Sequence, residues 1–567
     1  MEESRITDRP LAVTNSQKLT STALIFLLIA AAAFYISAIT PDSFGFYHDD
    51  SIYVATAKSL ATGQGYRIIS LPGEPTQTKS PPLHPFLLSL IWRVNPNFPA
   101  NLWAMMLLSA LAAAISLALI WRYLTAQAYA SRLQALLIVA LTALNWRTVI
   151  LSSGIYSEMF YLAVSVAGLH LAEEYEKKQT RWATGTALGV ILGLAFLART
   201  SGITLLVAVA FYYLLRRQFK RALMPLATGA SIALAWIGWG YFNRPTGGGV
   251  NASYYESYIK SYSEIIRDAQ AQTGQSGFTI LLSIIGKNLL TLLIASVPLI
   301  CLGLPFDFAP RFGENLFTVI LIALGVTLFL ILAGLLRHIK AGFRLLHIYV
   351  ILYFCLHLIW PYSGQDRFLM PLLPFLLLFL VTELERVAQL IRKGFKSSGL
   401  SYKAAALLMT APLIALISFA AYNYGSGLYA SLIPFKAKYA ARAAEDTEAI
   451  QWIKEHTDPS DVLVCYRDPM YYLYTGRKAT RSSPLIEGGN MVASQRSLEE
   501  RAEVIFRIIQ ENGARYLVLT SSDLELESQA DAYQKTYNML LDRNSQVFVP
   551  VFKSTDGRCV IYRVHDS

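Results

Sequence analysis

The sequence predicts a multi-pass α-helical membrane protein that ends in a soluble, extracytoplasmic α/β domain. Hydrophobic residues make up 54% of the 567 residues and charged residues 15%, whereas soluble proteins carry about 25% charged residues. The apolar residues fall in separated runs of about 20, the length that crosses a bilayer. From Ser431 onward the composition becomes that of a soluble protein. These observations exclude an ordinary soluble enzyme, a disordered chain and a coiled-coil rod.

Eleven apolar runs are long enough to be spans. They are 20–40, 102–120, 133–150, 155–172, 182–198, 202–215, 222–241, 316–336, 345–360, 368–384 and 404–422. Basic clusters such as Arg216/Arg217 and Arg337/Lys340 occupy every second loop, and an excess of Lys and Arg marks cytoplasmic loops. We therefore expect the N-terminal tail, 1–19, to be cytoplasmic and the C-terminal domain, 431–567, to be periplasmic or otherwise extracytoplasmic.

The apolar segment 280–304 does not fit this alternation. A single extra crossing there would place the basic loop around Arg337 on the outer side. We expect this segment to be an interfacial or re-entrant helix, or to contain two short spans. The transmembrane domain, 20–430, then has about 11 to 13 spans in the cytoplasmic (inner) membrane. Its large outer loops are 41–100 and 243–313, and the Tyr-rich part of the second loop is predicted to form an interfacial helix.

Helical and strand-like patterns alternate in the C-terminal domain. DVLVCYR, RYLVLT, QVFVPVF and CVIYRV read as strands, and amphipathic helices lie between several of them. Such alternation predicts a small α/β domain with a partly parallel sheet. Cys465 and Cys559 lie in two of these strands and are either packed thiols or, in an oxidising compartment, a disulfide. The net charge of +11 comes from short loops beside the spans, so we expect no binding of nucleic acid.

Three carboxylates lie on the predicted outer side. Asp49 and Asp50 begin an amphipathic helix in the first outer loop, and Glu158 begins a span. Carboxylates favour a helix N-terminus because of its dipole, so capping alone would account for the aspartates. An interfacial side chain that reaches headgroup water would account for Glu158. The alternative is that these groups face a cavity at the membrane surface, where one would act as a general base.

Few cations lie on that side, among them Lys79, Arg199 and Arg367. An arginine beside a span on the outer face runs against the usual charge bias. Arg367 is therefore either a ligand for an anion such as a lipid phosphate or the partner of its neighbour Asp366. The isolated histidines, at positions 48, 84 and 357, show no metal-ligand spacing and are interpreted as hydrogen-bonded structural residues.

Five short motifs resemble the GT-C membrane glycosyltransferases when they are taken in order. They are HDDSIY, KSPPLHPFLL, SEMF, LARTSG and DRFLMPLLPFL. The resemblance covers roughly Phe44 to Leu378 and is greatest to the bacterial branch of protein O-mannosyltransferase-like and aminoarabinose-transferase-like enzymes. It implies transfer of a sugar, with inversion, from a polyprenyl-phosphate donor. The acceptor would be a lipid glycan, a polysaccharide or a protein at the outer face of the membrane.

The resemblance also assigns expected roles to individual residues. Asp49 matches the base of the acidic motif, and Asp50 occupies the second position, where relatives often have Glu. Glu158 matches a second acidic position, and Lys79 and Arg367 match positions that contact the donor phosphate. Two adjacent aspartates leave open which of them faces the acceptor.

Arg199, in the LARTSG motif, is a further candidate for binding the donor phosphate. No cofactor is certain, and a divalent metal stays open because some GT-C enzymes need one and others do not. A lipid or solute transporter and a non-catalytic membrane scaffold are the alternative functions. The ionisable candidates gather at one membrane surface, which favours chemistry at that surface over transport through the middle.

Overall fold

A computed structural model describes residues 15–177, 182–244, 255–304, 314–360, 365–396, 399–482, 497–524 and 530–565. Most of the predicted N-terminal tail and parts of the loop 243–313 lie outside the described residues. The same is true of the side chain of Asp366, so its predicted ion pair with Arg367 is not described.

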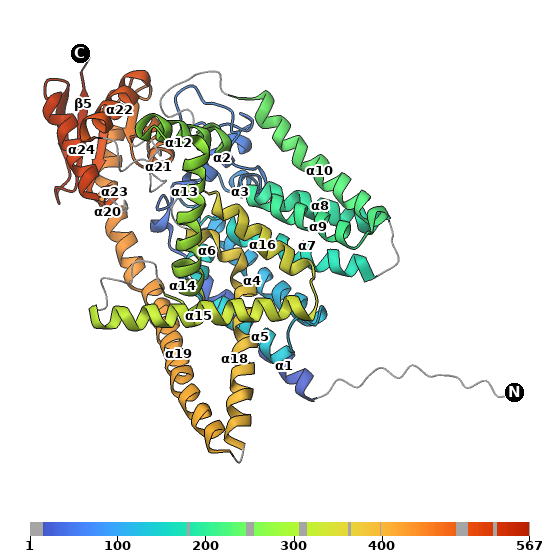
Figure 1. Ribbon diagram of the computed structural model, residues 1–567. Coiled ribbons are helices and arrows are strands. Elements are labelled where there is room, and N and C mark those ends of the chain that lie inside the picture. The colour runs from blue at the N-terminus through green and yellow to red at the C-terminus, as the bar shows by residue number, and fades with distance from the viewer. Residues whose placement is uncertain are drawn as a thin grey trace.

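Helices form almost all of the chain up to residue 432 (Figure 1). The first half contains α1 (Asn15–Ala38), η1 (Pro41–Ser43), α2 (Asp49–Ala61), α3 (Leu83–Val94), α4 (Leu102–Ala126), α5 (Arg132–Leu144), α6 (Trp146–Ser153), α7 (Glu158–Lys177), α8 (Trp182–Ala198), η2 (Thr200–Gly202), α9 (Ile203–Leu215) and α10 (Phe219–Phe242). The second half contains α12 (Tyr258–Thr273), α13 (Gly277–Leu290), η3 (Thr291–Ser296), α14 (Val297–Cys301), α15 (Glu314–Ala341), α16 (Leu345–Leu358), α17 (Gln365–Phe368), η5 (Met370–Leu372), α18 (Leu373–Lys396) and α19 (Leu400–Leu432).

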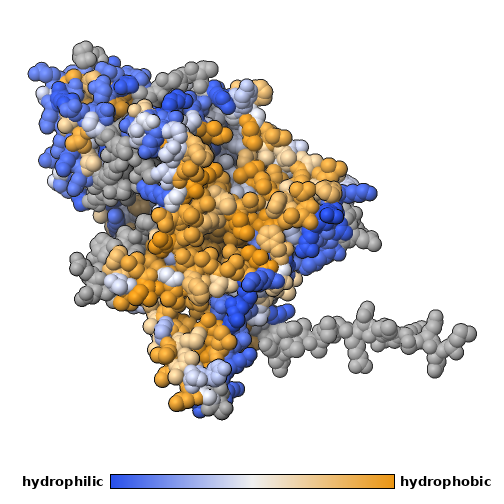
Figure 2. Space-filling view, viewed as in Figure 1, coloured by the Kyte–Doolittle hydropathy of each residue, from blue (hydrophilic) through white to orange (hydrophobic). Residues whose placement is uncertain are grey.

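Six helices of the described part of the chain are long and apolar enough to cross a membrane, or seven if the bent pair of α5 and α6 counts as one span. Apolar side chains also dominate the middle of the visible face, over these helices, whereas the C-terminal end is hydrophilic (Figure 2). Exposed Leu, Ile and Phe side chains on α1, α10, α15 and α19 contribute to this surface. A contiguous exposed apolar surface of this extent needs a lipid environment. The protein is therefore a membrane protein with several spans.

One predicted span is bent, and the segment 280–304 is a single helix rather than two short spans. The run 133–150 is not straight, because α5 and α6 meet at Asn145 with a bend of 62°. The Asn145 side chain accepts a hydrogen bond from the Arg147 backbone N–H at 3.1 Å, and its amide donates to the Ile300 carbonyl at 2.8 Å. The segment 280–304 forms one continuous helical run, Gly277–Cys301, through a short π-helical turn. In Figure 1, α15 runs across the direction of α13.

The C-terminal region begins with α20 (Pro434–His456), which continues from α19, and it contains one five-stranded sheet. Its other elements are β1 (Val462–Cys465), α21 (Asp468–Thr475), β2 (Lys478–Arg481), α22 (Leu498–Glu511), β3 (Tyr516–Thr520), α23 (Ser521–Leu524), α24 (Ala530–Arg543), β4 (Phe548–Lys553) and β5 (Cys559–Val564). The strand order is β2-β1-β3-β5-β4, with parallel β1–β2 and β1–β3 pairs and antiparallel β3–β5 and β4–β5 pairs. The partly parallel α/β sheet is thus confirmed. Cys465 and Cys559 are both buried free thiols, so the structure has packed thiols and no disulfide between them.

A single hydrophobic core joins the first loop, 41–100, to the C-terminal region. Val54 and Leu88 from the loop are fully buried with Leu463 and Tyr471 from the sheet and α21. Burial of this kind is worth about 25 cal/mol per Å² of apolar surface. Backbone bonding reinforces it, since the Ala479 N–H donates to the Ser70 carbonyl at 2.9 Å. The two regions therefore pack as one body at the end of the molecule that holds α2, α12 and α21 (Figure 1).

Candidate active site

A cavity of about 230 Å³ lies between the first loop, α12 and the ends of α8 and α16. Its charged and hydroxyl-bearing wall consists of Asp49, Lys79, Arg199, Thr200 and Ser201. Its aromatic and apolar wall consists of Tyr53, Pro81, Ala198, Ile203, Tyr258, Leu356, His357, Trp360 and Phe368. A mixed lining of apolar side chains with a few convergent polar groups is typical of a small-molecule site.

Asp49 is the carboxylate that reaches this cavity. It is the first residue of α2, where the helix dipole favours a negative charge. Its side chain is 43% exposed, and one of its oxygens lies 3.1 Å from the Arg367 guanidinium. A molecule in the cavity can therefore reach the Asp49 carboxylate, which could accept a proton from it.

Asp50 faces the opposite way, into the protein. It is 2% exposed and accepts hydrogen bonds from the backbone N–H groups of Gly45 at 2.9 Å and Ser51 at 2.6 Å. Burial raises the pKa of Asp50 to about 8, although these two N–H groups oppose the shift. At neutral pH Asp50 is mostly protonated, and it does not line the cavity. Of the two predicted aspartates, the geometry therefore favours Asp49 as the base.

Glu158 lies behind the cavity wall and is fully buried. One of its oxygens is 2.8 Å from Arg199 and 2.5 Å from Arg367. One oxygen of Glu158 thus contacts two guanidinium groups. The only other carboxylate in contact with this arginine pair, among the described residues, is the half-exposed Asp49. Removal of one partner from a buried pair is costly because an uncompensated charge is left. Glu158 therefore fixes the positions of the arginines.

Local backbone geometry brings Arg199 to this point. Arg199 follows the last residue of α8, and the short helix η2 turns the chain back into α9. A Cβ atom at Gly202 would lie 2.2 Å from the Ala195 carbonyl oxygen, so only glycine fits this close return. The Arg199 guanidinium also donates to the Ser157 hydroxyl at 3.0 Å. The LARTSG motif thus builds a rigid turn that presents an arginine.

Arg367 is 8% exposed and lies against two tyrosine rings. Its guanidinium carbon is 5.1 Å from the Tyr47 ring centre and 5.2 Å from that of Tyr156. Cation–π contacts of this kind and the two carboxylates stabilise the charge. Burial alone would lower the pKa of Arg367, but the charges of Glu158 and Asp49 outweigh it and raise that pKa. Arg367 is consequently a fixed cation at every working pH.

Lys79 lies on the same wall, in a loop that other segments hold in place. Its ammonium is 5.0 Å from the centre of the Tyr258 ring. The Thr78 hydroxyl donates to the Glu256 carbonyl at 2.5 Å, and the Trp239 indole donates to the Gln77 carbonyl at 3.1 Å. Burial lowers the pKa of Lys79 to about 7, against the opposing charge of Asp49. Lys79 can therefore change its charge near neutral pH.

His357 also lines the cavity, although the sequence indicated only a structural histidine. Its Nδ1–H donates to the Tyr353 carbonyl at 2.8 Å, so the neutral ring presents Nε2 as an acceptor. Nothing in the sequence indicated that Tyr53, Tyr258 and Trp360 also line the cavity. Aromatic residues at helical spacing normally read as core, and no sequence signal separates those that face a cavity.

The donor set does not fit a metal ion. The described part of the chain contains no group of three or more His, Cys, Asp or Glu side chains placed to hold one. At the cavity, Asp49 and Glu158 are instead paired with arginines. No step of the reaction proposed below is routed through a metal.

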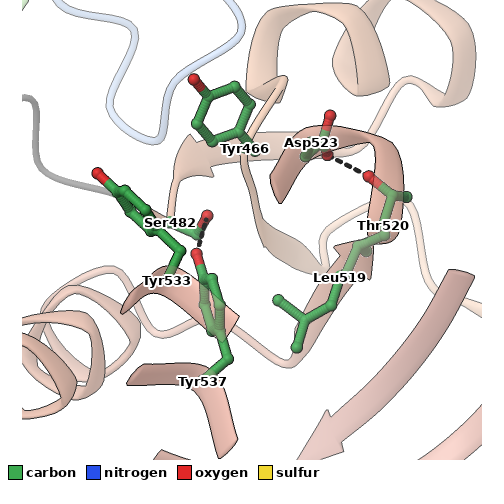
Figure 3. Close-up of a pocket in the computed structure, with 8 residues that line it drawn as sticks. Tyr466, Ser482, Leu519, Thr520, Asp523, Tyr533 and Tyr537 are labelled. Carbon is green, nitrogen blue, oxygen red and sulfur yellow. Dashed lines mark hydrogen bonds between the residues drawn. The ribbon is translucent and has the colours of Figure 1, made fainter. Parts of the chain in front are cut away.

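A second hollow lies in the C-terminal region and is much smaller. Tyr466, Ser482, Thr520, Asp523, Tyr533 and Tyr537 are among the residues that surround it (Figure 3). Its volume is about 10 Å³, at the lower limit for one water molecule. The Tyr537 hydroxyl donates to Ser482 at 2.9 Å, and the Thr520 hydroxyl donates to Asp523. These polar groups satisfy one another, so this hollow is too small and too well paired for a substrate.

Residues 79–241 match the family model described as dolichyl-phosphate-mannose-protein mannosyltransferase. No curated protein sequence matches the chain. The apo structure of ArnT from Cupriavidus metallidurans is similar at 14% identity, with a TM-score of 0.50 over 96% of this chain and 98% of ArnT. The Archaeoglobus fulgidus oligosaccharyltransferase tethered to an acceptor peptide is similar at 12% identity, with a TM-score of 0.54 over 96% and 74% of the two chains. AglB from the same organism, in complex with an inhibitory peptide and a dolichol-phosphate, is 13% identical, with a TM-score of 0.51 over 96% and 74%.

At these identities the solved structures show a shared fold, and the family match adds a glycosyltransferase relationship for residues 79–241. The relationship to GT-C membrane glycosyltransferases, first seen in the order of five short motifs, is thus confirmed.

Proposed function

We propose that this chain, as a member of the GT-C superfamily of membrane glycosyltransferases, transfers one sugar from a polyprenyl-phosphate donor to an acceptor hydroxyl or amine. The observation that carries the proposal is the cavity in which one exposed carboxylate, Asp49, lies among the cations Lys79, Arg199 and Arg367. Its volume of about 230 Å³ is close to the lower end of ligand pockets, about 300 Å³. A space of that size suits one sugar and its phosphate better than a long glycan.

The reaction is a single displacement at the anomeric carbon. The acceptor oxygen or nitrogen forms a bond to that carbon while the bond between the carbon and the phosphate oxygen breaks. The acceptor proton passes to Asp49, and polyprenyl phosphate leaves with the electron pair of the broken bond. Attack from the face opposite the phosphate inverts the anomeric configuration. General-base assistance of this kind contributes about 10² to 10⁴ in rate.

The cations stabilise the charge that grows on the departing phosphate. Arg199 and Lys79 line the cavity, and Arg367 borders it through Asp49. Fixed charges in a site with little water stabilise developing charge without having to reorganise. A phosphate leaving group needs little protonation by a general acid. One carboxylate that acts as the base, together with several cations that bind the phosphate, is therefore sufficient.

The aromatic wall provides a surface for the sugar and the start of the lipid. Tyr258, Trp360 and Phe368 line the cavity together with the cations, and the Tyr258 ring lies 5.0 Å from the Lys79 ammonium. Trp360 lies two residues beyond the end of the apolar helix α16, and Phe368 is the last residue of α17. The lipid tail can therefore lie along α16 while its phosphate meets the cations. We further propose that the site opens at the extracytoplasmic face of the membrane, as the distribution of basic loops predicts.

Purified protein incubated with radiolabelled polyprenyl-phosphate sugars tests the proposal. We expect release of polyprenyl phosphate and transfer of label to an acceptor or, more slowly, to water. A transporter would move the lipid across a vesicle membrane and leave its bond to the sugar intact. Movement without bond cleavage by folded protein would contradict the proposed function.

A further inference from the structure

We propose that Asp468, in the C-terminal region, is a positioning residue for Asp49, so that the C-terminal region completes the active site. The inference rests on the proposed function for its consequence in catalysis, but its structural part stands on contacts alone. No role for the C-terminal region follows from the reaction itself, since all the residues that line the cavity come from the membrane region and its loops.

The Asp468 carboxylate joins three segments that are far apart in the sequence. One oxygen is 2.6 Å from Nε2 of His48, in the first loop. The other accepts a hydrogen bond from the Tyr255 hydroxyl at 2.9 Å, from the segment before α12. Asp468 is fully buried, so solvent cannot replace either donor. An ionised carboxylate can accept hydrogen bonds from two donors, one on each of its two oxygens.

His48 transmits this contact to the base. It is the residue before Asp49 and the N-cap of α2, and its carbonyl accepts from the Ile52 N–H at 3.3 Å and from the Ser51 hydroxyl at 2.9 Å. Fixing the imidazole therefore fixes the first turn of α2, from which Asp49 projects. Burial lowers the pKa of His48, although Asp468 opposes the shift, so a neutral ring that donates through Nε2 accounts for the contact.

Tyr255 connects the same carboxylate to the segment that supports Lys79. The next residue, Glu256, accepts the hydrogen bond from Thr78 beside Lys79, and Tyr258 lies under the Lys79 ammonium. One carboxylate thus connects the segment that carries the base with the segment that holds a phosphate-binding cation. A displacement of about 1 Å in such a constellation costs about 10²-fold in rate.

A neighbouring close contact supports the same arrangement. Gly45 has a φ of +82°, and a Cβ atom there would lie 2.7 Å from Sδ of Met470, on α21. The Gly45 N–H is also the donor that holds Asp50. The helix that carries Asp468 therefore packs directly against the turn at Gly45, whose N–H holds Asp50 inward.

The test compares full-length wild type with Asp468→Asn and Tyr255→Phe, and uses Asp461→Asn as a matched control. The first substitution keeps the size of the side chain but replaces one acceptor oxygen by an amide group. Asp461 is also buried in the C-terminal region, but its side chain contacts the Asp458 N–H and Arg515. The measurements are hydrogen exchange of the backbone amides, and kcat and KM for the polyprenyl-phosphate sugar.

We expect Asp468→Asn to speed exchange in residues 44–52 and 255–260 while the sheet stays protected, and to lower kcat by about 10²-fold with KM within about threefold. Tyr255→Phe should give a smaller effect of the same kind, and Asp461→Asn neither. Unchanged exchange in both segments, or faster exchange spread evenly over the sheet, would overturn the inference. If wild type transfers no sugar, the proposed function fails, and the exchange data still decide whether Asp468 holds the two segments.

Discussion

Two buried clusters of this protein have nearly the same chemistry and opposite surroundings. In the membrane region, Asp49 and Glu158 pair with Arg199 and Arg367. In the C-terminal region, Asp446 and Asp523 pair with Arg442 and Arg467. The first cluster borders a cavity of about 230 Å³ and includes a carboxylate that is 43% exposed. In the second, every one of the four side chains is at most 7% exposed.

The difference shows that a group of charges becomes a site where one of its members can be reached from a cavity. Arg467 makes a bidentate contact with Asp446, at 2.5 and 2.8 Å, and a third bond to Asp523 at 2.6 Å. Tyr471 also donates to Asp446 at 2.8 Å. The closed cluster therefore holds α20, α21 and the end of β3 together. The open cluster leaves the Asp49 carboxylate accessible to a substrate.

The largest expected effect concerns the closed cluster. Arg467→Met should lower the free energy of unfolding of the C-terminal region by about 3–5 kcal/mol, because Asp446 loses its buried counter-charge and Asp523 keeps only Arg442. Hydrogen exchange of the backbone amides of the five-stranded sheet at increasing denaturant concentration measures this loss. Arg543→Met, which removes an exposed pair with Glu499, should cost less than about 1 kcal/mol. Similar losses in the two variants would remove the distinction between a closed and an exposed charge pair.

The next effect concerns the open cluster. Arg367→Ala should weaken use of the donor by about 10- to 100-fold, since a hydrogen bond to a charged group is worth about 1.5–3 kcal/mol. Use of the acceptor should change far less. Steady-state kinetics with each substrate varied in turn measures both, and Arg93→Ala, a surface change, is the control. Equal losses for donor and acceptor would mean that Arg367 acts only as an ion-pair partner.

The smallest effect depends on pH. Lys79, with a pKa lowered by burial to about 7, is charged below pH 7 and loses its charge as the pH rises. The phosphodiester of the donor stays a monoanion throughout this range. Donor affinity should therefore fall between pH 7 and 9, by at most about tenfold per pH unit. In Lys79→Arg the affinity should stay constant up to pH 9, and a fall as steep as that of wild type would assign the pH dependence to another group.

Much of the fold and the main polar residues of the site could be predicted from the sequence. The basic loops placed Asp49, Lys79 and Arg199 on one side of the membrane, and these three line one cavity. The choice between Asp49 and Asp50 could not be made, because adjacent helical residues point about 100° apart. Which of the two faces inward depends on the turn at Gly45, whose N–H binds Asp50.

The missed elements were short ones. The helix α21 and the strand β2, of 8 and 4 residues, have too few positions for a clear hydrophobic period. Yet α21 carries Asp468, and β2 carries Lys478, which donates to the Ile69 carbonyl at 2.6 Å. Contacts between distant segments, which no local pattern encodes, thus join the C-terminal region to the site.

We propose that Asp49 is the base and that Asp50 is structural. The most direct measurement compares sugar transfer by wild type, Asp49→Asn and Asp50→Asn, together with the melting temperature of each protein. We predict that Asp49→Asn lowers kcat by about 10² to 10⁴ and leaves the melting temperature unchanged. Asp50→Asn should retain most of its turnover, because Asp50 is buried and does not line the cavity. Near-wild-type turnover by Asp49→Asn, with loss of turnover in a folded Asp50→Asn, would show that Asp50 and not Asp49 is the base.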